Sequence, residues 1–388
     1  MITATRLLEI LTDLVRIESI NPRLAPGGSG EAGIARRVIR CLAQSGLKTQ
    51  LQELEPERFN AIGILKGTGS GRSLILNGHL DTVGVYGMED PFSARVEGNR
   101  LYGRGAQDMK GGLAAALVAV EELAKGPQLQ GDVIVTAVAD EEFESLGTRA
   151  LLEAGALADG AIVMEPTGLD IVTAHRGFAW AEVVTQGRAA HGSRPEEGLD
   201  AIAFMGRVLG ELETLQAFLS RGHGHPVLGH GSVHASLITG GQELSSYPAE
   251  CRLSLERRLI PGEDRTTVER EITQILSGLA QQDPHFSARH KVGYAAKALE
   301  TPRESAIVQD LLACAQRTIG PRAKLGAQSF WTDGALLNEA GIPTVLFGPG
   351  GAGLHSAAEY VNLDDVALCA ETLAECARVF CRSPACTP

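Results

Sequence analysis

Hydrophobic residues follow two alternating spacings over the first 177 residues of the chain. Apolar positions every three or four residues predict helices, whereas short unbroken runs of Ile, Leu and Val predict strands buried on both faces. Strands of this kind with helices between them are typical of an α/β sheet covered on both sides. We expect helices at 3–18, 30–45 and 111–125, and strands at 61–66, 73–77, 132–138 and 161–164.

The pattern changes after residue 177, where strand and helix spacings succeed one another in the order strand, helix, strand, strand, helix, strand. This order is that of ferredoxin-like folds, and about 115 residues is a suitable length for one such domain. The six elements are expected at 180–185, 199–219, 232–239, 251–259, 266–281 and 286–292.

The α/β pattern resumes near the C-terminal end, with helices expected at 303–319, 333–340 and 363–381 and a strand in "IPTVLF". The simplest architecture is one α/β domain interrupted by a smaller inserted domain. We therefore predict an α/β fold whose mixed, mostly parallel sheet is flanked by helices and built from residues 1–178 and 295–388. Residues 179–294 form the inserted ferredoxin-like α+β domain in this prediction.

Residues that can bind metals follow several of the predicted strands. His79 and Asp81 stand after an apolar strand in "LILNGHLDT", and residues two apart in an extended chain point the same way. A carboxylate at that spacing can accept the second ring N–H of the histidine and fix its tautomer for metal binding. A surface loop with two ordinary polar residues is the alternative.

Carboxylates occupy comparable positions elsewhere in the chain. "TAVADEEFESLG" places Glu141 and Glu142 after a strand, and "AIVMEPT" places Glu165 after another. Asp108 precedes the apolar helix in "LYGRGAQDMKGG", where a helix cap is the alternative, and His355 follows a glycine-rich loop in "FGPGGAGLHSAAEY". Adjacent carboxylates repel one another unless a positive charge compensates them. Solvated loop charges are the simpler explanation for each site taken alone.

Taken together, these positions suggest one site, because the strand ends of an open α/β sheet converge on a single crevice. Two histidines and three carboxylates suit two divalent ions. In this hypothesis His79 and Glu165 bind one ion, Glu142 and His355 bind the other, and Asp108 bridges them. Imidazole and carboxylate ligands without a thiolate suit zinc and tolerate cobalt or manganese.

The adjacent glutamate has a separate use in the same hypothesis. Neighbouring side chains diverge, so Glu141 can face a water held by the two ions while Glu142 binds metal. A free carboxylate beside that water can take its proton and later deliver the proton to a leaving amine. Glu141 is therefore the candidate general base.

Composition restricts the partners and the compartment. The formal net charge of -12 disfavours nucleic acid and anionic membrane surfaces. No apolar run approaches the length needed to span a membrane, and the first residues lack the apolar core of a signal peptide. The seven cysteines follow no disulfide spacing. We expect a reduced, cytoplasmic protein.

The motifs extend to a family resemblance that covers nearly the whole chain. "GHLDT", "GRGAQDMKGG", "DEEFESLG", "EPT", "AHRG", "AHGSRPEEGLDAI" and "FGPGGAGLHSAAEY" resemble, in order, the co-catalytic zinc family of acetylornithine deacetylase. Succinyl-diaminopimelate desuccinylase, glutamate carboxypeptidase and aminoacylase belong to the same family, and "EPT" with "VTAHRG" is most similar to the acetylornithine deacetylase branch. The resemblance implies a cis peptide bond after Asp108, a role for Asp81 in orienting His79, and Glu141 as the base. It also implies the metal ligands His79, Asp108, Glu142, Glu165 and His355.

The resemblance assigns the inserted domain to dimerisation and to covering the site. His191 in "GRAAHGSRP" matches a histidine that reaches the active site across a dimer and steadies the oxyanion; a loop histidine is the alternative. Arg258 in "ERRLIPGE" matches an arginine that receives the substrate carboxylate, for which its planar fork is suited; a strand-end surface charge is the alternative. Ser245 stands where relatives often have Asn, so that role is not carried over. For the histidines between residues 223 and 234 a surface loop is preferred to a second metal site.

The leading functional hypothesis is a metal-dependent amidohydrolase that removes an N-acyl group, with N-acetyl expected first, from an amino acid such as acetylornithine. A succinyl-diaminopimelate desuccinylase, a metallo-carboxypeptidase or a dipeptidase would use the same site. A non-catalytic binding protein on the same fold is the alternative from another class. We expect a homodimer with a small N-acyl amino acid as its substrate. The sequence leaves open which acyl group, which amino acid and which metal.

Overall fold

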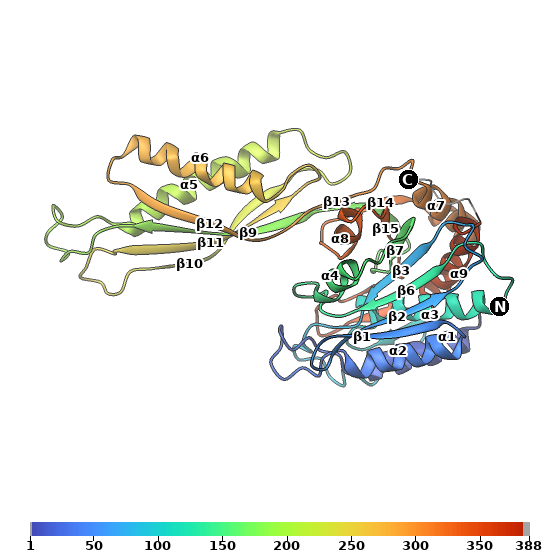
Figure 1. Cartoon of the computed structure of the whole chain (residues 1–388). Coiled ribbons are helices and arrows are strands. Elements are labelled where there is room, and N and C mark those ends of the chain that lie inside the picture. Colours follow the sequence, from blue (N-terminus) through green and yellow to red (C-terminus); the bar gives the residue numbers. More distant parts are fainter. Residues whose placement is uncertain (1, 383–388) are drawn as a thin grey trace. The chain divides into compact units, whose positions relative to one another are not determined.

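The computed structural model describes residues 2–382 and divides them into two compact units (Figure 1). The larger unit contains the chain up to Thr173, residues 301–327 and the chain from Thr332 onward. The smaller unit contains Ala174–Glu300 and Gln328–Trp331. Each unit has its own cluster of buried apolar side chains.

A nine-stranded sheet, most of whose strands belong to the larger unit, has the order β1-β2-β6-β3-β7-β15-β8-β13, with β14 paired to β8. The central pairs, which join β3 to β6 and β7 and join β7 to β15, are parallel, whereas β1, β2 and β6 pair antiparallel. The mixed α/β fold is therefore confirmed. The strands are β1 Lys48–Glu55, β2 Arg58–Leu65, β3 Leu74–His79, β6 Val133–Val138, β7 Gly160–Val163, β8 Ile171–His175, β13 Leu299–Glu300, β14 Leu325–Gln328 and β15 Thr344–Leu346.

Helices of this unit pack on the sheet and on one another through apolar side chains. Helix α1 buries Leu7, Ile10, Leu11 and Leu14, a spacing of three and four residues that forms one stripe. Helix α3 is buried nearly all round, since it packs against α1, α2 and α9 as well as the sheet. The helices of this unit are α1 Ala4–Arg16, α2 Ala32–Gln44, α3 Gly111–Ala124, α4 Leu146–Glu153, α7 Ala306–Thr318, α8 Gly334–Glu339 and α9 Leu363–Phe380.

A second, small sheet lies in the same unit and brings distant loops together. It has the order β16-β17-β5-β4, and its strands are β4 Arg95–Glu97, β5 Arg100–Tyr102, β16 Gly351–Ala352 and β17 Tyr360–Asn362. Strand β5 leads into the loop of Asp108, and the loop of His355 leads into β17. Their antiparallel pairing, with Tyr102 opposite Tyr360, holds these two loops side by side.

The smaller unit contains the order of elements expected for a ferredoxin-like fold. Its antiparallel sheet runs β10-β11-β9-β12, and alternate residues of β11 are buried against the helices. Asp200 caps the start of α5 and Asp264 that of α6, as expected for acidic residues at helix N-termini. The elements are β9 Gly177–Gln186, α5 Ala201–Arg221, β10 Ser232–Gly240, β11 Glu250–Leu259, α6 Arg265–Gln282 and β12 Ser287–Ala296.

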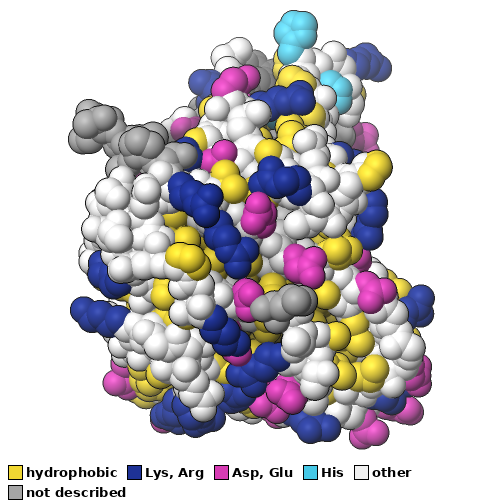
Figure 2. Space-filling view, turned by 90° about the vertical axis from the view of Figure 1, so that its right-hand side faces the viewer, with side chains coloured by type: hydrophobic (Ala, Val, Ile, Leu, Met, Phe, Trp, Pro, Cys, Tyr) yellow, Lys and Arg dark blue, Asp and Glu magenta, His cyan; other side chains and the backbone are white. Residues whose placement is uncertain are grey.

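The surface of the molecule carries charges of both signs. On the face shown in Figure 2, acidic and basic side chains are interspersed, with small groups of apolar side chains between them. None of the helices in residues 2–382 has the length and apolar character needed to cross a membrane.

Candidate metal centre

His79 is the last residue of β3 and is buried. Its Nδ1 atom lies 2.8 Å from the backbone oxygen of Asp81 but 3.8 Å from that residue's carboxylate. The sequence led us to expect the carboxylate as the partner of this ring nitrogen, and the structure corrects that detail. A backbone carbonyl orients a histidine equally well, and it directs Nε2 toward Asp108, whose Oδ1 is 3.0 Å away.

The carboxylate of Asp81 holds the acidic stretch instead. Its Oδ1 accepts the backbone N–H of Glu141 at 3.1 Å. Its Oδ2 accepts the N–H of Glu142 at 3.2 Å and the side-chain amide of Asn21 at 2.8 Å. Asp81 therefore fixes the backbone from which both glutamates project.

The three adjacent acids of the stretch have different environments. Asp140 is buried and accepts hydrogen bonds from Arg58 at 2.8 Å and from Asn21 at 3.0 Å. Arg58 also makes two hydrogen bonds to Glu31, at 2.6 and 2.7 Å. Because an arginine compensates Asp140, the other two carboxylates remain available for the site. No pattern in the sequence connects Asn21 or Arg58 with this stretch, so both were missed.

Asp108 lies between the two predicted histidine ligands. Its Oδ1 is 3.0 Å from Nε2 of His79, and its Oδ2 is 3.3 Å from Nε2 of His355. The same nitrogen of His355 is 3.2 Å from the carboxylate of Glu142. The peptide bond after Asp108 is cis, as the resemblance implies. The position of Asp108 is that required of a bridging ligand.

The predicted ligands form two overlapping groups. Ligand atoms of His79, Asp108 and Glu142 lie within 4.8 Å of one another, and so do those of His79, Glu141 and Glu165. Glu165 enters the second group because it follows β7, the parallel neighbour of β3. A side chain on Gly112 would overlap the backbone oxygen of Met164, so a glycine there lets α3 approach this strand end. Glu141 is thus as near to His79 as a ligand is, and geometry alone does not separate base from ligand.

The protonation of the cluster indicates a site built for positive charge. Burial raises the pKa of Glu165 to about 8 and, with the charge of Glu165, holds that of Glu141 well above its ordinary value. Hydrogen bonds to Asp108 and Glu142 raise the pKa of His355 to about 10. Burial opposes ionisation of Asp108, but hydrogen bonds from both histidines lower its pKa. Without cations, bound protons reduce the repulsion among these carboxylates.

The residues present fit two divalent cations. Two carboxylate oxygens, Oε1 of Glu142 and Oε1 of Glu165, are buried without a hydrogen-bond partner among residues 2–382. Buried polar atoms are normally paired, so these two oxygens are available to ligate. Imidazole nitrogens and carboxylate oxygens are ligands that zinc, cobalt and manganese accept.

The remaining predicted residues belong to the smaller unit. His191 is exposed, with Nδ1 2.8 Å from the hydroxyl of Ser193. Arg258, near the end of β11, is half-buried; it pairs with Glu256 at 2.7 Å and lies over the ring of Phe178. These two residues are not in the cluster of the larger unit.

The histidines between residues 223 and 234 form no metal-ligand group among the described residues. His225 instead closes a turn: its Nδ1 accepts the backbone N–H of Leu228 at 3.2 Å, and its Nε2 is 3.0 Å from Glu300.

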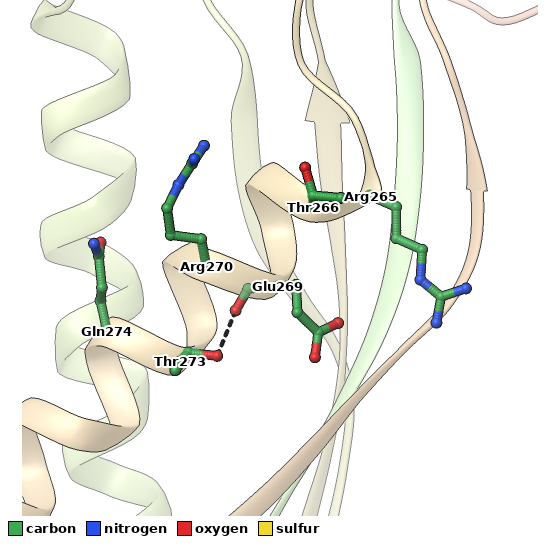
Figure 3. Close-up of a pocket in the computed structure, with 6 residues that line it drawn as sticks. All are labelled: Arg265, Thr266, Glu269, Arg270, Thr273 and Gln274. Carbon is green, nitrogen blue, oxygen red and sulfur yellow. Dashed lines mark hydrogen bonds between the residues drawn. The ribbon is translucent and has the colours of Figure 1, made fainter.

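One surface depression of the smaller unit does not have the make-up of a binding site. It has a volume of about 370 Å³ and lies along α6 (Figure 3). All its lining side chains come from that single helix, and the hydroxyl of Thr273 donates to the backbone oxygen of Glu269 within the helix at 2.7 Å. Groups from separate elements do not converge there, which a built site requires.

Comparison with known proteins gives consistent matches. The profile of "Peptidase family M20/M25/M40" matches residues 75–379. Acetylornithine deacetylase of Myxococcus xanthus is 33% identical over 85% of this chain and 86% of its own. N-formyl-4-amino-5-aminomethyl-2-methylpyrimidine deformylase of Halalkalibacterium halodurans is 31% identical over 94% of this chain and 93% of its own. The crystal structure of a tripeptidase from Staphylococcus aureus has the same fold, with a TM-score of 0.81 and 21% identity over 99% of this chain and 100% of that one.

Proposed function

Because the chain belongs to peptidase family M20/M25/M40, we propose that it is a metal-dependent amidohydrolase that removes an acyl group from an amine nitrogen. The observation that carries the proposal is the cluster of two histidines and buried carboxylates that follow β3, β6 and β7 or lie in the loops of Asp108 and His355. Two of its carboxylate oxygens have no partner among residues 2–382. Such a cluster costs stability unless cations compensate it.

Five side chains would hold the ions. His79 and Glu165 would bind one, Glu142 and His355 the other, and Asp108 would bind both. When bound, two divalent ions supply Lewis acidity toward an amide carbonyl and lower the pKa of a water molecule. Zinc is the expected metal, with cobalt or manganese as alternatives.

Glu141 is the proposed general base. Its carboxylate would take the proton of the attacking water and deliver it to the nitrogen of the leaving amine when the C–N bond breaks. Without ions, burial and the charge of Glu165 raise the pKa of Glu141. Bound cations would oppose this shift and keep the carboxylate ionised, as a proton acceptor must be. The backbone of Glu141 is held by Asp81 at 3.1 Å, which supports a fixed position for the base.

The proposed substrate is an N-acyl amino acid, with N-acetylornithine as the first candidate. The relative from Myxococcus xanthus, named for deacetylation, supports this choice. The named deformylase supports a second candidate, a formamide of an aminomethylpyrimidine, which carries no carboxylate. We assign Arg258 to the substrate carboxylate, and that role has a purpose only for the first candidate. Succinylated and peptide substrates remain in the same chemical class.

We also propose a homodimer in which His191 stabilises the oxyanion in the site of the partner subunit. Strand β10 is an edge strand, and its exposed residues include Leu237 and Ile238. An exposed apolar edge strand favours pairing with a second copy. Mixing inactive Glu141→Ala and His191→Ala chains tests the role of His191, since a heterodimer would contain one site with both residues. Recovered activity supports action between subunits, and none after verified subunit exchange contradicts it.

The test of the function uses purified protein reconstituted with zinc, cobalt or manganese. N-acetyl, N-succinyl and N-formyl amino acids, dipeptides and the formylated aminomethylpyrimidine are the substrates. Glu141→Gln should keep both metals and lose about 10²- to 10⁴-fold in kcat, whereas Glu144→Gln, an exposed neighbour, should change little. Metal binding without turnover of any amide would favour a binding protein. Loss of metal from Glu141→Gln would mean that Glu141 is a ligand.

A further inference from the structure

Glu359 is a buried carboxylate that the proposed reaction does not use. It stands four residues after His355 and is 1% exposed. Its Oε2 accepts the N–H of Gly105 at 3.0 Å, and its Oε1 accepts those of Gln107 at 2.9 Å and Asp108 at 3.1 Å. Both oxygens are therefore bonded to the backbone of the segment that ends in Asp108.

Arg104 completes the connection between the two loops. It is also 1% exposed, and its Nη1 donates to Oε2 of Glu359 at 2.7 Å. Its Nη2 donates to the backbone oxygen of Ser356, next to His355, at 3.0 Å. Residues 104–108 and 355–359 are thus joined by an ion pair and by hydrogen bonds, although about 250 residues separate them in the chain.

The consequence of this connection lies at the cluster. Nε2 of His355 is 3.3 Å from the carboxylate of Asp108 and 3.2 Å from that of Glu142. The carboxylates of Asp108 and Glu142 repel each other when both are ionised. If the loops of Asp108 and His355 were held together only by their ligand side chains, this repulsion would separate them in the absence of an ion. Glu359 holds Asp108 by its backbone N–H, which keeps the Asp108 carboxylate in place. The oxygens of that carboxylate take no part in the bond to Glu359 and can bind metal.

We infer that Glu359 and Arg104 are positioning residues that preset the separation of Asp108 and His355, so that metal affinity depends on them although neither contacts an ion. The inference rests on the proposed function in taking these two residues as ligands. A purely structural ion pair is the competing explanation, and it would affect folding without affecting metal binding. Buried ion pairs often contribute little net stability, which allows the two explanations to be separated.

The first measurement is titration of metal-free Glu359→Gln with Zn²⁺ by calorimetry or against a chelating dye. The amide of glutamine has one oxygen, so its NH₂ group faces a backbone N–H of the 105–108 segment. We expect affinity to fall about 10- to 100-fold, as for other residues that orient metal ligands. The control is Glu271→Gln, which breaks one of the two ion pairs of the wholly buried Arg257 in the smaller unit. It should lower thermal stability and leave Zn²⁺ affinity unchanged.

A second variant distinguishes loss of positioning from loss of folding stability. Glu359→Gln leaves Arg104 as an unpaired buried charge, which is strongly destabilising. The double variant Arg104→Met with Glu359→Gln has no such charge, so the metal-free protein should recover thermal stability while Zn²⁺ affinity stays about 10- to 100-fold weak. Wild-type affinity in either folded variant, or affinity that recovers together with stability, would overturn the inference. Failure of the wild-type protein to bind two ions would instead overturn the proposed function.

Discussion

Replacing Asp81 by Asn should reduce kcat more than it reduces metal affinity. The carboxylate of Asp81 has two donors on Oδ2, the side chain of Asn21 at 2.8 Å and the N–H of Glu142 at 3.2 Å. Only one donor, the N–H of Glu141 at 3.1 Å, reaches Oδ1. An asparagine should therefore place its oxygen where two donors meet and turn its NH₂ group toward Glu141.

The size of the effect follows from that one lost contact. A hydrogen bond to a charged group contributes about 1.5–3 kcal/mol, and about 1.4 kcal/mol corresponds to a tenfold change. Displacement of the base should therefore lower kcat about 10- to 100-fold. Burial raises the pKa of Asp81, which means that its charge is costly to bury, so a neutral amide should offset part of the folding stability lost with that contact.

The assay compares kcat at saturating metal with metal affinity from calorimetry, for wild type and Asp81→Asn. Asp159→Asn is the matched control, because Asp159 accepts the N–H and hydroxyl of Ser73 at the opposite end of β3, at 2.8 and 2.9 Å. The control should retain wild-type kcat. A large loss of metal affinity at unchanged kcat would show that Asp81 acts on a ligand instead of on Glu141, and unchanged values of both would refute the reasoning.

Three further predictions concern metal binding, dimerisation and substrate binding. Chelation should lower the melting temperature by about 5–10 °C. A free metal concentration of about 100 times the Kd contributes ~2.7 kcal/mol to folding stability, and each kcal/mol shifts the melting temperature by ~2–4 °C. An unchanged melting temperature after verified loss of metal would contradict this. Leu237→Asp should weaken dimerisation at least about tenfold by placing a charge on the exposed edge of β10, as sedimentation would measure. Arg258→Lys should raise KM about tenfold for carboxylate-bearing substrates with little change in kcat, and an unchanged KM would remove it from substrate binding.

The buried strands were the most predictable part of the fold. The strands expected at 73–77, 132–138 and 161–164 correspond to β3, β6 and β7, because strands covered on both faces must be continuously apolar. Strand β1 was missed, since it lies at the sheet edge and carries the polar sequence "KTQLQELE". The short strands β4, β5, β16 and β17 were also missed, because segments of two or three residues leave no periodic pattern.

The candidate site was predictable for a related reason. Every proposed ligand except His355, which follows a glycine-rich loop, follows a strand or precedes a helix, and strand ends of an α/β sheet are known to converge. The residues that hold the ligands in place were not predictable. Asn21 reaches Asp81 across 60 residues and Asp140 across 119, and neither separation matches any local motif. The partner of His79 was assigned to the wrong atom of Asp81, because spacing cannot distinguish a side-chain oxygen from a backbone oxygen.

A common arrangement connects the two loops that carry the proposed ligands. Asp81 accepts the backbone N–H groups of Glu141 and Glu142, and Glu359 accepts those of Gly105, Gln107 and Asp108. In each case a buried carboxylate that does not ligate holds the main chain of a segment that does. Because the bonds are made to main-chain N–H groups, this support engages none of the ligand oxygens, which stay available for cations. Such supports depend on main-chain donors, which every residue except proline supplies, and residue identity in the sequence therefore gives no sign of them.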